Sequence, residues 1–496
     1  MYLEPHRVFC ARTPKASYKG ESCSRFPELG GNVEASPALL ALRSLLIHAG
    51  LDKSGFNSPD WNPFGDLIRE GERVLIKPNW VNHRNPEGSG LECLVTDTSV
   101  LEAILHYVAK TRPRCIVLGD APIQGCDFDR LLLDGRVNEM VNRFKKMNVA
   151  LVVKDFRRTI QPDGVLGGRA LENCRSIQDF ILYDLGFSSL VDEITTLGSN
   201  FRVAMYDPAA MQRTHARGKH QYLIARDAIE ADVVINVPKL KTHKKAGLTG
   251  ALKNVVGING HKEYLPHHRK GGSGHGGDCY PGRSGFKRIV ESLFDATNSA
   301  HSNIARRFLA NAVRAGVVLG KAMGKDDNYE GAWHGNDTVW RMTLDLQRVL
   351  HYGRTDGTVA DDIQRRVITI TDAIIAGEGE GPLRPSPVGL KMLTMGTNPA
   401  SVEWVHALLM GLDPYRIPLI RQAFSPNGWS VATFSPHEII VTVDGQRIAL
   451  SELFSRYGHA FRPPAGWKGY IELGTSEAAL QFQGEPREST AGDSSR

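Results

Sequence analysis

The chain has 496 residues, of which 41% are hydrophobic and 23% are charged, a balance typical of globular proteins. Its 50 glycines and 26 prolines are too few for a collagen-like or low-complexity chain. The 60 basic and 54 acidic residues leave a net charge of +6, which over this length argues against nucleic-acid binding. Proteins that bind nucleic acid usually concentrate basic charge on one face.

The seven cysteines include no C-x-x-C pair, so the sequence predicts neither a disulfide framework nor an iron–sulfur cluster on this chain. The N-terminal segment lacks the apolar core and the cleavage site of a signal peptide. No stretch approaches the ~20 apolar residues that a spanning helix needs. We therefore expect a cytoplasmic protein with no transmembrane segment.

Short apolar runs alternate with helical patterns along most of the chain. The segment 96–110 has apolar residues at helical spacing, and its Ser99 and Glu102 have the spacing of a capping box. Strands are predicted over 72–78, 115–122, 148–155, 231–243 and 366–382. This alternation predicts an α/β fold with a mixed, mostly parallel sheet that helices cover on both faces.

The segment 258–360 interrupts the alternation with a loop rich in glycine and histidine and two amphipathic helices. We interpret it as an inserted, lid-like subdomain. A small β-hairpin is expected over 437–454, because Asp444-Gly445 is a strong turn signal. The predicted parts are a first α/β part (1–257) with a lysine-rich motif, the insertion (258–360), a second α/β part (361–474) with an acidic motif and the hairpin, and a disordered tail (475–496).

Polar residues follow several predicted strands, and ligands of α/β sheets bind at the carboxyl ends of strands. Lys77 and Asn79 follow the first strand, and we assign both to ligand binding. Asp97 begins a helix and Asp120 ends the second strand, where each suits a divalent metal ion. A solvated strand end for Lys77 and a helix cap for either aspartate are the structural alternatives.

The strongest motif is P-K-L-K-T-H-K-K at 238–245, which follows the buried run 233–235. It leads into the segment 247–256, whose small residues suit a helix. Lysines at a strand end and a helix start suit a carboxylate or a phosphate. A solvated basic face is one alternative, and nucleic-acid binding, which lacks interleaved aromatic residues here, is another. Candidate ligand-binding residues are Lys239, Thr242, Lys253 and Asn254, and candidate catalytic residues are Lys241 and His243.

Histidines cluster at and after this motif. Imidazole titrates near neutrality, so His243 is our candidate proton carrier. The cluster could also ligate a metal, but its spacing matches no standard zinc signature, and a mobile loop is the alternative. The other members are His261, His267, His268 and His275, with Asp278 and Cys279 nearby.

The acidic motif G-E-G-E-G-P at 377–382 ends the last predicted strand, in which Asp372 lies. Carboxylates between glycines can approach a ligand or a hard cation closely, whereas a turn with two solvated glutamates is the alternative. We assign Asp372 to catalysis, and Glu378 and Glu380 to the same divalent metal as the two earlier aspartates. Lysines and carboxylates in one cleft would repel within each set unless an anion and a cation neutralised them.

At five segments the sequence resembles the domain-of-unknown-function 362 family. They are IKPN (76–79), TDTSVLEAIL with GDAP (96–105 and 119–122), INVPKLKTH with LTGALKNVVG (235–243 and 248–257), TDAIIAGEGEGP (371–382) and MGTNPASVEWVHALLMG (395–411). The segment 335–346 looks like a pattern of a longer subgroup. Two departures are visible: Glu403 replaces a common Asp, and the ferredoxin-like cysteine segment of many relatives is missing. The resemblance implies an α/β fold and no established reaction.

Three functions remain open. The leading interpretation is an enzyme that acts on a small anionic molecule, a carboxylate or a phosphate, with the help of a divalent metal. The second is a redox protein that exchanges electrons with a separate ferredoxin-like, iron–sulfur partner, an association that the cluster segments of relatives suggest. The third is a non-catalytic anion-binding or membrane-peripheral protein, because the basic amphipathic segment 303–325 could lie on an anionic membrane. Packing on the protein's own core is the alternative for that segment.

Overall fold

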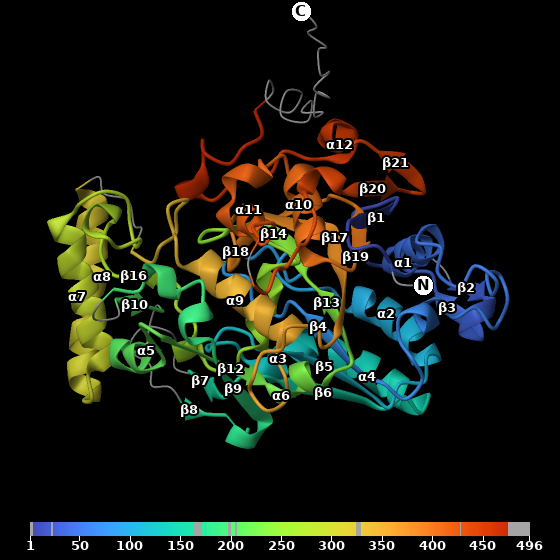
Figure 1. The fold of residues 1–496 in the computed structure, drawn as a ribbon, viewed down its shortest axis with the longest axis horizontal. Coiled ribbons are helices and arrows are strands. Elements are labelled where there is room, and N and C mark those ends of the chain that lie inside the picture. The colour runs from blue at the N-terminus through green and yellow to red at the C-terminus, as the bar shows by residue number, and fades with distance from the viewer. Residues whose placement is uncertain are drawn as a thin grey trace, which may run out of the picture.

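The computed structural model describes residues 3–20, 23–161, 171–173, 175–196, 200–203, 206–323, 329–426 and 428–474. A 12-stranded mixed sheet forms its centre (Figure 1). The main path of the sheet, in spatial order, is β21 (Gln446–Ile448), β20 (Ile440–Val443), β1 (Arg7–Arg12), β19 (Met392–Gly396), β17 (Arg366–Glu380), β13 (Val233–Val237), β4 (Arg73–Pro78), β5 (Cys115–Asp120) and β6 (Leu151–Asp155). The strands from β17 to β6 are parallel, which confirms the predicted sheet type.

Alternate residues of the strands supply two hydrophobic cores, one on each face of the sheet. In β4, Val74 and Ile76 join one core, and Leu75 between them joins the other. The first core contains residues of α1 (Pro37–His48), α2 (Thr98–Lys110) and α4 (Val137–Lys146). The second contains residues of α9 (Val339–Tyr352), α10 (Pro399–Leu409) and α11 (Pro418–Ala423). Helices therefore cover both faces, as expected.

The remaining elements are shorter or lie at the periphery. The helices are α3 (Phe128–Asp134), α5 (Pro208–Thr214), α6 (Arg226–Glu230), α7 (Gly285–Ser299), α8 (Asn303–Ala322) and α12 (Leu450–Tyr457). Four small sheets pair β2 (Cys23–Phe26) with β3 (Gly31–Glu34), β7 (Thr159–Ile160) with β8 (Leu171–Glu172), β10 (Phe201–Arg202) with β16 (His268–Arg269), and β12 (Lys219–Ala225) with both β9 (Phe180–Asp184) and β11 (His215–Ala216).

The lysine-rich segment forms two strands where the sequence predicted one. Pro238 has no N–H with which to continue the ladder, and it separates β13 from β14 (Lys239–His243). β14 pairs in parallel with β17 and antiparallel with β15 (Gly247–Thr249), while β18 (Arg384–Val388) also pairs with β17. The predicted helix over 247–256 was wrong. The chain forms β15 and then a 3₁₀ helix, η6 (Lys253–Ile258), because Gly247 turns the backbone with a φ of 84°.

Two local predictions also needed correction. The cap of α2 is Asp97, whose carboxylate accepts the Ser99 N–H, so Ser99 lies inside the helix. The hairpin of β20 and β21 is confirmed, with φ angles of 46° at Asp444 and 84° at Gly445 that match its turn. Residues 450–454 belong to α12 instead. The predicted disordered tail, 475–496, lies outside the described residues.

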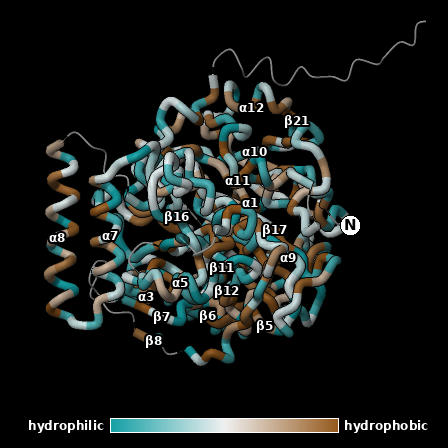
Figure 2. Tube along the Cα trace, turned by 60° about the vertical axis from the view of Figure 1, so that its left-hand side comes forward, coloured by the Kyte–Doolittle hydropathy of each residue, from teal (hydrophilic) through white to brown (hydrophobic). Residues whose placement is uncertain are grey.

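Helices α7 and α8 pack against each other beside the sheet, at the left of Figure 1. Figure 2 shows that α8 is the outer of the two and carries apolar residues along its length. Within the described part of the chain, no helix is long and apolar enough to cross a bilayer.

Candidate functional site

A cavity of about 380 Å³ lies beyond the ends of β4, β5 and β14. Its lining includes residues that are far apart in the sequence but were all predicted to lie at a site: Asn79, Asp120, His243, Lys253 and Asn254. The structure therefore brings these residues together at the carboxyl ends of the strands, where ligand sites of α/β sheets usually form. Residues of the segment 258–360 close another side, among them Lys262, His267 and Glu330.

Lys77 and Asp120 form a buried ion pair beside the cavity. Lys77 Nζ lies 2.7 Å from Asp120 Oδ1, and it also donates to the Pro78 carbonyl and to Asn254 Oδ1. The carboxylate accepts the backbone N–H groups of Trp80 and Ala121 as well. Burial lowers the pKa of Lys77, and Asp120 opposes that shift. Asp120 is thus occupied as the partner of a lysine, not as the open metal ligand that the sequence suggested.

Gly257 holds the backbone of η6 against this ion pair. A Cβ at this position would lie 1.9 Å from Asp120 Oδ1 and 2.7 Å from Lys77 Nζ. Real Cβ atoms do not approach so closely, so the position admits no side chain unless the pair moves. The backbone also donates the Ala121 N–H to the Gly257 carbonyl.

Amide side chains extend the network from this pair to Lys241. Asn254 Oδ1 accepts from Asn79 Nδ2 at 3.0 Å, and Asn79 Oδ1 accepts from Lys241 Nζ at 2.7 Å. Lys241 also donates to the Leu94 carbonyl. Burial, with Lys239 nearby, lowers the pKa of Lys241 to about 7. Asn79 and Asn254 line the cavity, whereas Lys241 lies behind Asn79.

A second buried network lies away from the cavity. Lys239 Nζ contacts Asp372 Oδ2 at 2.5 Å and Tyr18 Oη at 2.6 Å, and Tyr18 donates to Asp372 Oδ1 at 2.8 Å. Asp97 donates its backbone N–H to Asp372 and caps α2 with its carboxylate. Burial, with Asp372 nearby, raises the pKa of Asp97. Lys239, Asp372 and Asp97 do not line the cavity.

The glutamates of the acidic motif hold a C-terminal segment to the end of β17. Glu378 accepts the Arg462 N–H at 2.9 Å, and Glu380 accepts the Ala465 N–H at 2.7 Å. Thr242 donates to the Gly379 carbonyl and is buried. The four predicted metal ligands therefore lie in three separate places. Among the residues that the structure describes, no three His, Cys, Asp or Glu side chains are grouped to hold a metal ion.

The lysines that line the cavity differ in their partners. Lys244 and Lys245 share Glu330, at 3.6 Å each. Burial opposes ionisation of Glu330, but the two lysines lower its pKa to about 2. Lys253 and Lys262 have no hydrogen bond or ion pair with any described side chain, although Lys253 is only 7% exposed. Burial lowers the pKa of Lys253 to about 7, with help from Lys262 and Lys245, and that of Lys262 to about 8.

Two histidines of the cavity present opposite hydrogen-bonding groups. His243 Nδ1 accepts the N–H groups of Lys245 and Ala246, which places the proton of the neutral ring on Nε2. His267 Nδ1 lies 2.7 Å from the Leu265 carbonyl, which places its proton on Nδ1 and leaves Nε2 as an acceptor. Burial, reinforced by the neighbouring lysines, lowers the pKa of both rings well below the usual range. Both are therefore neutral near pH 7.

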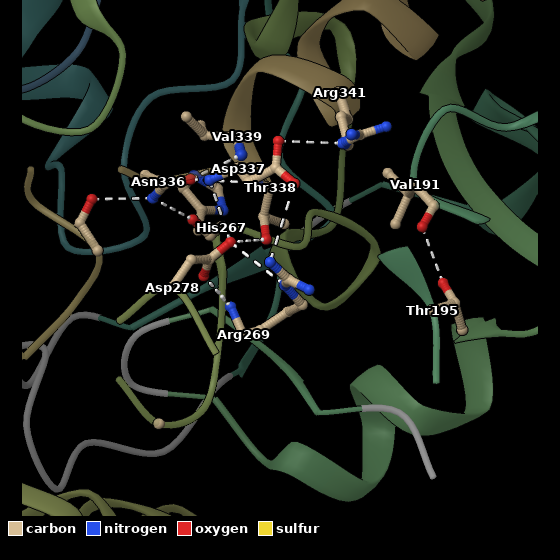
Figure 3. A network of polar contacts seen from close by, with 12 residues as sticks. Val191, Thr195, His267, Arg269, Asp278, Asn336, Asp337, Thr338, Val339 and Arg341 are labelled. Atoms are coloured by element: carbon tan, nitrogen blue, oxygen red, sulfur yellow. Dashed lines mark hydrogen bonds and ion pairs between the residues drawn. The ribbon is translucent and has the colours of Figure 1, made fainter. Parts of the chain in front are cut away.

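The backbone of His267 is held by a polar network of the insertion (Figure 3). Asn336 Nδ2 donates to the His267 carbonyl at 2.9 Å. Asp278 accepts the Thr338 hydroxyl and the Arg269 N–H, both at 2.5 Å, and so joins this loop to the start of α9. Asp278 therefore has a structural role. Of the predicted histidine cluster, His243 and His267 line the cavity, whereas His261, His268 and His275 do not.

Glu403, at which the chain departs from the family pattern, fixes the turn before Lys253. Its Oε2 accepts the Ala251 N–H at 2.7 Å and lies 3.1 Å from His406 Nδ1, with both side chains fully buried. A Cβ on Gly250 would lie 2.3 Å from the same carboxylate oxygen. The longer side chain at position 403 thus reaches the backbone of this turn.

The rest of the cavity wall is largely apolar. Its apolar members include Val81, Ile123, Val203, Tyr206, Val256, Pro382 and Leu383, and its neutral polar members are Gln124, Gln161 and Thr249. The cavity therefore offers cationic groups on one side and apolar contact on another. Such a combination fits a small molecule with an anionic group and a hydrocarbon part.

The sequence-based prediction omitted three charged residues of the lining that bear on the site, namely Lys245, Lys262 and Glu330. Lys262 and Glu330 come from the insertion, and Lys245 belongs to the lysine-rich motif but was not selected. The pair His261-Lys262, which begins four residues after Gly257, is a weak signal for Lys262. Nothing in the segment around Glu330 distinguishes it from a surface glutamate, because its role depends on lysines that lie 85 and 86 positions earlier.

The fold and cavity define an α/β protein with a mixed sheet and a cationic pocket at its strand ends. Residues 179–407 match the model of the domain of unknown function DUF362, which includes both the lysine-rich and the acidic motifs. This match agrees with the resemblance that the motifs indicated.

Two further comparisons give more distant similarity. The chain is 21% identical over 385 residues to the "Thylakoid-associated protein sll1697" of Synechocystis sp., which covers 78% of this chain and 74% of that protein. A crystal structure of a protein from Thermotoga maritima aligns with 69% of this chain at 11% identity and a TM-score of 0.30. This chain spans about half of that protein, 53% of its length.

Proposed function

We propose that the protein is an enzyme that binds a small anionic molecule with an apolar part in the cavity and acts on it by acid–base chemistry. The observation that supports this proposal is the pair of lysines, Lys253 and Lys262, that face the cavity without a partner. Burying a cation costs free energy unless an opposite charge accompanies it. A bound carboxylate or phosphate would supply that charge.

The carboxylates of the cavity do not already fill this role. Asp120 is paired with Lys77, and Glu330 is shared by Lys244 and Lys245. Protonated lysines therefore outnumber carboxylates in the described lining. Neutralising this excess is the physical reason for a bound anion.

The two cavity histidines would supply proton transfer and orientation. His267 Nε2 is an acceptor and suits a base, whereas His243 Nε2–H is a donor and suits a hydrogen bond to the ligand. The sequence suggested His243 as the proton carrier, but its Nδ1 already accepts two backbone N–H groups. We therefore propose His267 for that role. A divalent cation would have to arrive with the ligand, since Asp97, Asp120, Glu378 and Glu380 all accept hydrogen bonds within the protein.

Isothermal titration with benzoate and with inorganic phosphate tests the proposal. Benzoate carries both a carboxylate and an apolar ring, whereas phosphate is only an anion. We expect benzoate to bind, and the double variant Lys253→Met and Lys262→Met to bind it at least about 10-fold more weakly, which corresponds to ~1.4 kcal/mol. Lys146→Met, which removes an exposed lysine of α4, is the matched control. Equal affinity of the wild type and the double variant would refute the proposal.

A second candidate function, attachment to a membrane surface, is favoured by the outer face of α8. Ile304, Phe308 and Val318 are 83%, 73% and 66% exposed on this face, and Val313 on the opposite face is buried against α7. Figure 2 shows these apolar stretches on the outermost helix. Isolated exposed apolar residues are ordinary, but a helix face of them marks an interaction site.

The charges of α8 suit an anionic membrane. Arg307, Arg314 and Lys321 are spaced by seven residues and so lie along one edge of the apolar face, and the helix contains no acidic residue. The relative from Synechocystis is named as thylakoid-associated, which agrees with this proposal. We therefore propose that α8 lies on the surface of an anionic bilayer.

Co-sedimentation with phosphatidylserine–phosphatidylcholine vesicles tests the attachment. We expect the wild type to pellet, and the double variant Ile304→Ser and Phe308→Ser to lose most of the bound fraction. Phe187→Ser is the control, because Phe187 is 75% exposed but far from α8 in sequence. Pelleting that is equal in all three proteins would exclude this surface.

A further inference from the structure

Lys253 combines features that separate it from the other lysines in and around the cavity. Its side chain is almost excluded from solvent, it lines a cavity with an apolar wall, and its ammonium has no acceptor among the described residues. By contrast, Lys77, Lys239 and Lys241 each donate two or more hydrogen bonds to oxygen atoms. An amine held without acceptors in an apolar, cationic site is the arrangement that activates lysine as a nucleophile.

We propose that Lys253 forms an imine with the carbonyl carbon of a small oxo acid that binds in the cavity. Lys262 and Lys245, which lie near enough to Lys253 to affect it electrostatically, would hold the carboxylate of that acid. This inference rests on the proposed function and narrows its substrate class to anions that also carry a ketone or aldehyde group.

The reaction balances without an oxidant or a reductant. The lone pair of Nζ attacks the carbonyl carbon, a C–N bond forms, and the C=O π electrons move to oxygen to give a carbinolamine. One Nζ proton then passes by way of His267 Nε2 to this oxygen, which becomes a neutral hydroxyl. The nitrogen lone pair forms the C=N bond as the C–O bond breaks, and the second Nζ proton passes by the same route to the departing hydroxide, which leaves as water. The product is a C=N bond between the ligand and Lys253. The same protein groups can run the sequence in reverse, which returns the free amine.

The charge environment favours the neutral amine that this step requires. Burial, Lys262 and Lys245 together lower the pKa of Lys253 from 10.5 to about 7. About half of its amines are then neutral at pH 7, on the order of a thousand times the fraction for an ordinary lysine. His243 and His267 are neutral at this pH. The two carboxylates of the described lining are already paired, Asp120 with Lys77 and Glu330 with Lys244 and Lys245, so neither restores the charged form.

Lys262 is the other lysine without a partner, and it suits the carboxylate better. It is more exposed than Lys253, and Asp120 raises its pKa in opposition to burial. Lys262 therefore stays protonated to higher pH, which an anion-binding group requires. Lys253 would thus act as the nucleophile, and Lys262 would bind the carboxylate.

Borohydride trapping followed by peptide mapping tests the proposal on the wild-type protein. The full-length protein is incubated at pH 7 with phenylpyruvate or pyruvate, reduced with sodium cyanoborohydride, digested and analysed by mass spectrometry. We expect the Lys253 peptide to gain the mass of the oxo acid less one oxygen atom, at least about 10-fold faster than exposed lysines such as Lys146. Mapping locates the adduct directly, so the result does not depend on the folding of a variant.

Two controls separate this proposal from the proposed function. Benzoate has no ketone, so it should slow trapping by competition and form no adduct itself. Lys262→Met should require a higher oxo-acid concentration for half-maximal trapping, while the site of the adduct remains Lys253. If benzoate binds in the cavity but no adduct forms at Lys253, or if adducts are spread evenly over exposed lysines, imine formation is wrong and anion binding stands. If no anion binds, the proposed function itself fails.

Discussion

Two groups of lysines lie in and around the cavity, and they differ in what compensates their charge. Lys77 and Lys239 each contact an aspartate, Asp120 and Asp372, and the aspartates accept further hydrogen bonds from backbone N–H groups. Lys253 and Lys262 have no such partner and face the cavity. The first group stabilises the end of the sheet. The second leaves an electrostatic cost in the free protein that an incoming anion relieves, so identical residue types serve structure in one place and recognition in the other.

Breaking a compensated pair should have the largest effect on stability. Lys239→Met leaves the Asp372 carboxylate fully buried without a cation, and we expect a loss of about 3–5 kcal/mol in the free energy of unfolding. The double variant Lys239→Met and Asp372→Asn should recover part of this loss, because it removes the uncompensated charge. Urea denaturation of the three proteins measures the effect. A loss below about 1 kcal/mol in the single variant would show that the pair is not compensated as described.

Removing a lysine that has no carboxylate partner should increase the free energy of unfolding. The lowered pKa of Lys253 means that the unfolded chain binds more protons between pH 7 and 10.5, so the stability cost is full below pH 7 and disappears as the pH rises toward 10.5. We expect Lys253→Met to stabilise the protein by about 1–3 kcal/mol at pH 6. The difference from the wild type should approach zero near pH 10. Destabilisation at pH 6 in urea titrations would contradict this view.

Anion affinity should depend on pH for the same reason. A bound anion favours protonated lysines, but Lys253 and Lys262 lose their protons near pH 7 and 8 in the free protein. Binding above these values therefore requires proton uptake, and we expect affinity for benzoate to fall about 10-fold or more between pH 6.5 and 9. Titration in two buffers of different ionisation enthalpy measures the uptake. Lys245 also has a lowered pKa, whereas both cavity histidines and Glu330 titrate below this range. If the affinity for benzoate did not change with pH, these lysines would not bind the anion.

The smallest effect is expected at the acidic motif. Glu378→Gln keeps an oxygen that can accept the Arg462 N–H, and the side chain does not line the cavity. We therefore expect benzoate affinity to stay within about two-fold and stability to fall by no more than about 1 kcal/mol. Calorimetry and urea denaturation measure both. A large loss of benzoate affinity would show that Glu378 takes part in ligand binding, as the sequence suggested.

The position of the candidate site could be predicted because the sequence shows where the buried strands end. Runs of Val, Ile and Leu that stop at polar residues located β4, β5 and β13, and parallel pairing then brought Asn79 and Asp120 together. Asn254 reaches the same place from η6. The lysine-rich motif supplied His243 and Lys253 by the same argument. Hydrophobic patterning and topology thus specified one wall of the cavity.

The sequence did not reveal which charged residues form ion pairs and which face the cavity without a partner. Whether a lysine is paired depends on carboxylates that lie far along the chain, such as Asp372, which is 133 positions from Lys239. Glu378 and Glu380 looked like metal ligands because glycines surround them, yet their partners are backbone N–H groups 84 and 85 positions later. Such partners have no local periodicity, so only the folded structure reveals them.

The position of β1 in the sheet has a consequence for the order of folding. This strand, at residues 7–12, lies between β19 and β20, with Val8 opposite Gly396 on one side and Val441 on the other. It is synthesised long before β19 and β20, so it acquires both neighbours only after the intervening chain has left the ribosome. During this interval the backbone of β1 has neither neighbouring strand to pair with. Pairing between segments so far apart in the sequence slows folding. A chain halted before residue 440 therefore leaves one edge of β1 open to other partners.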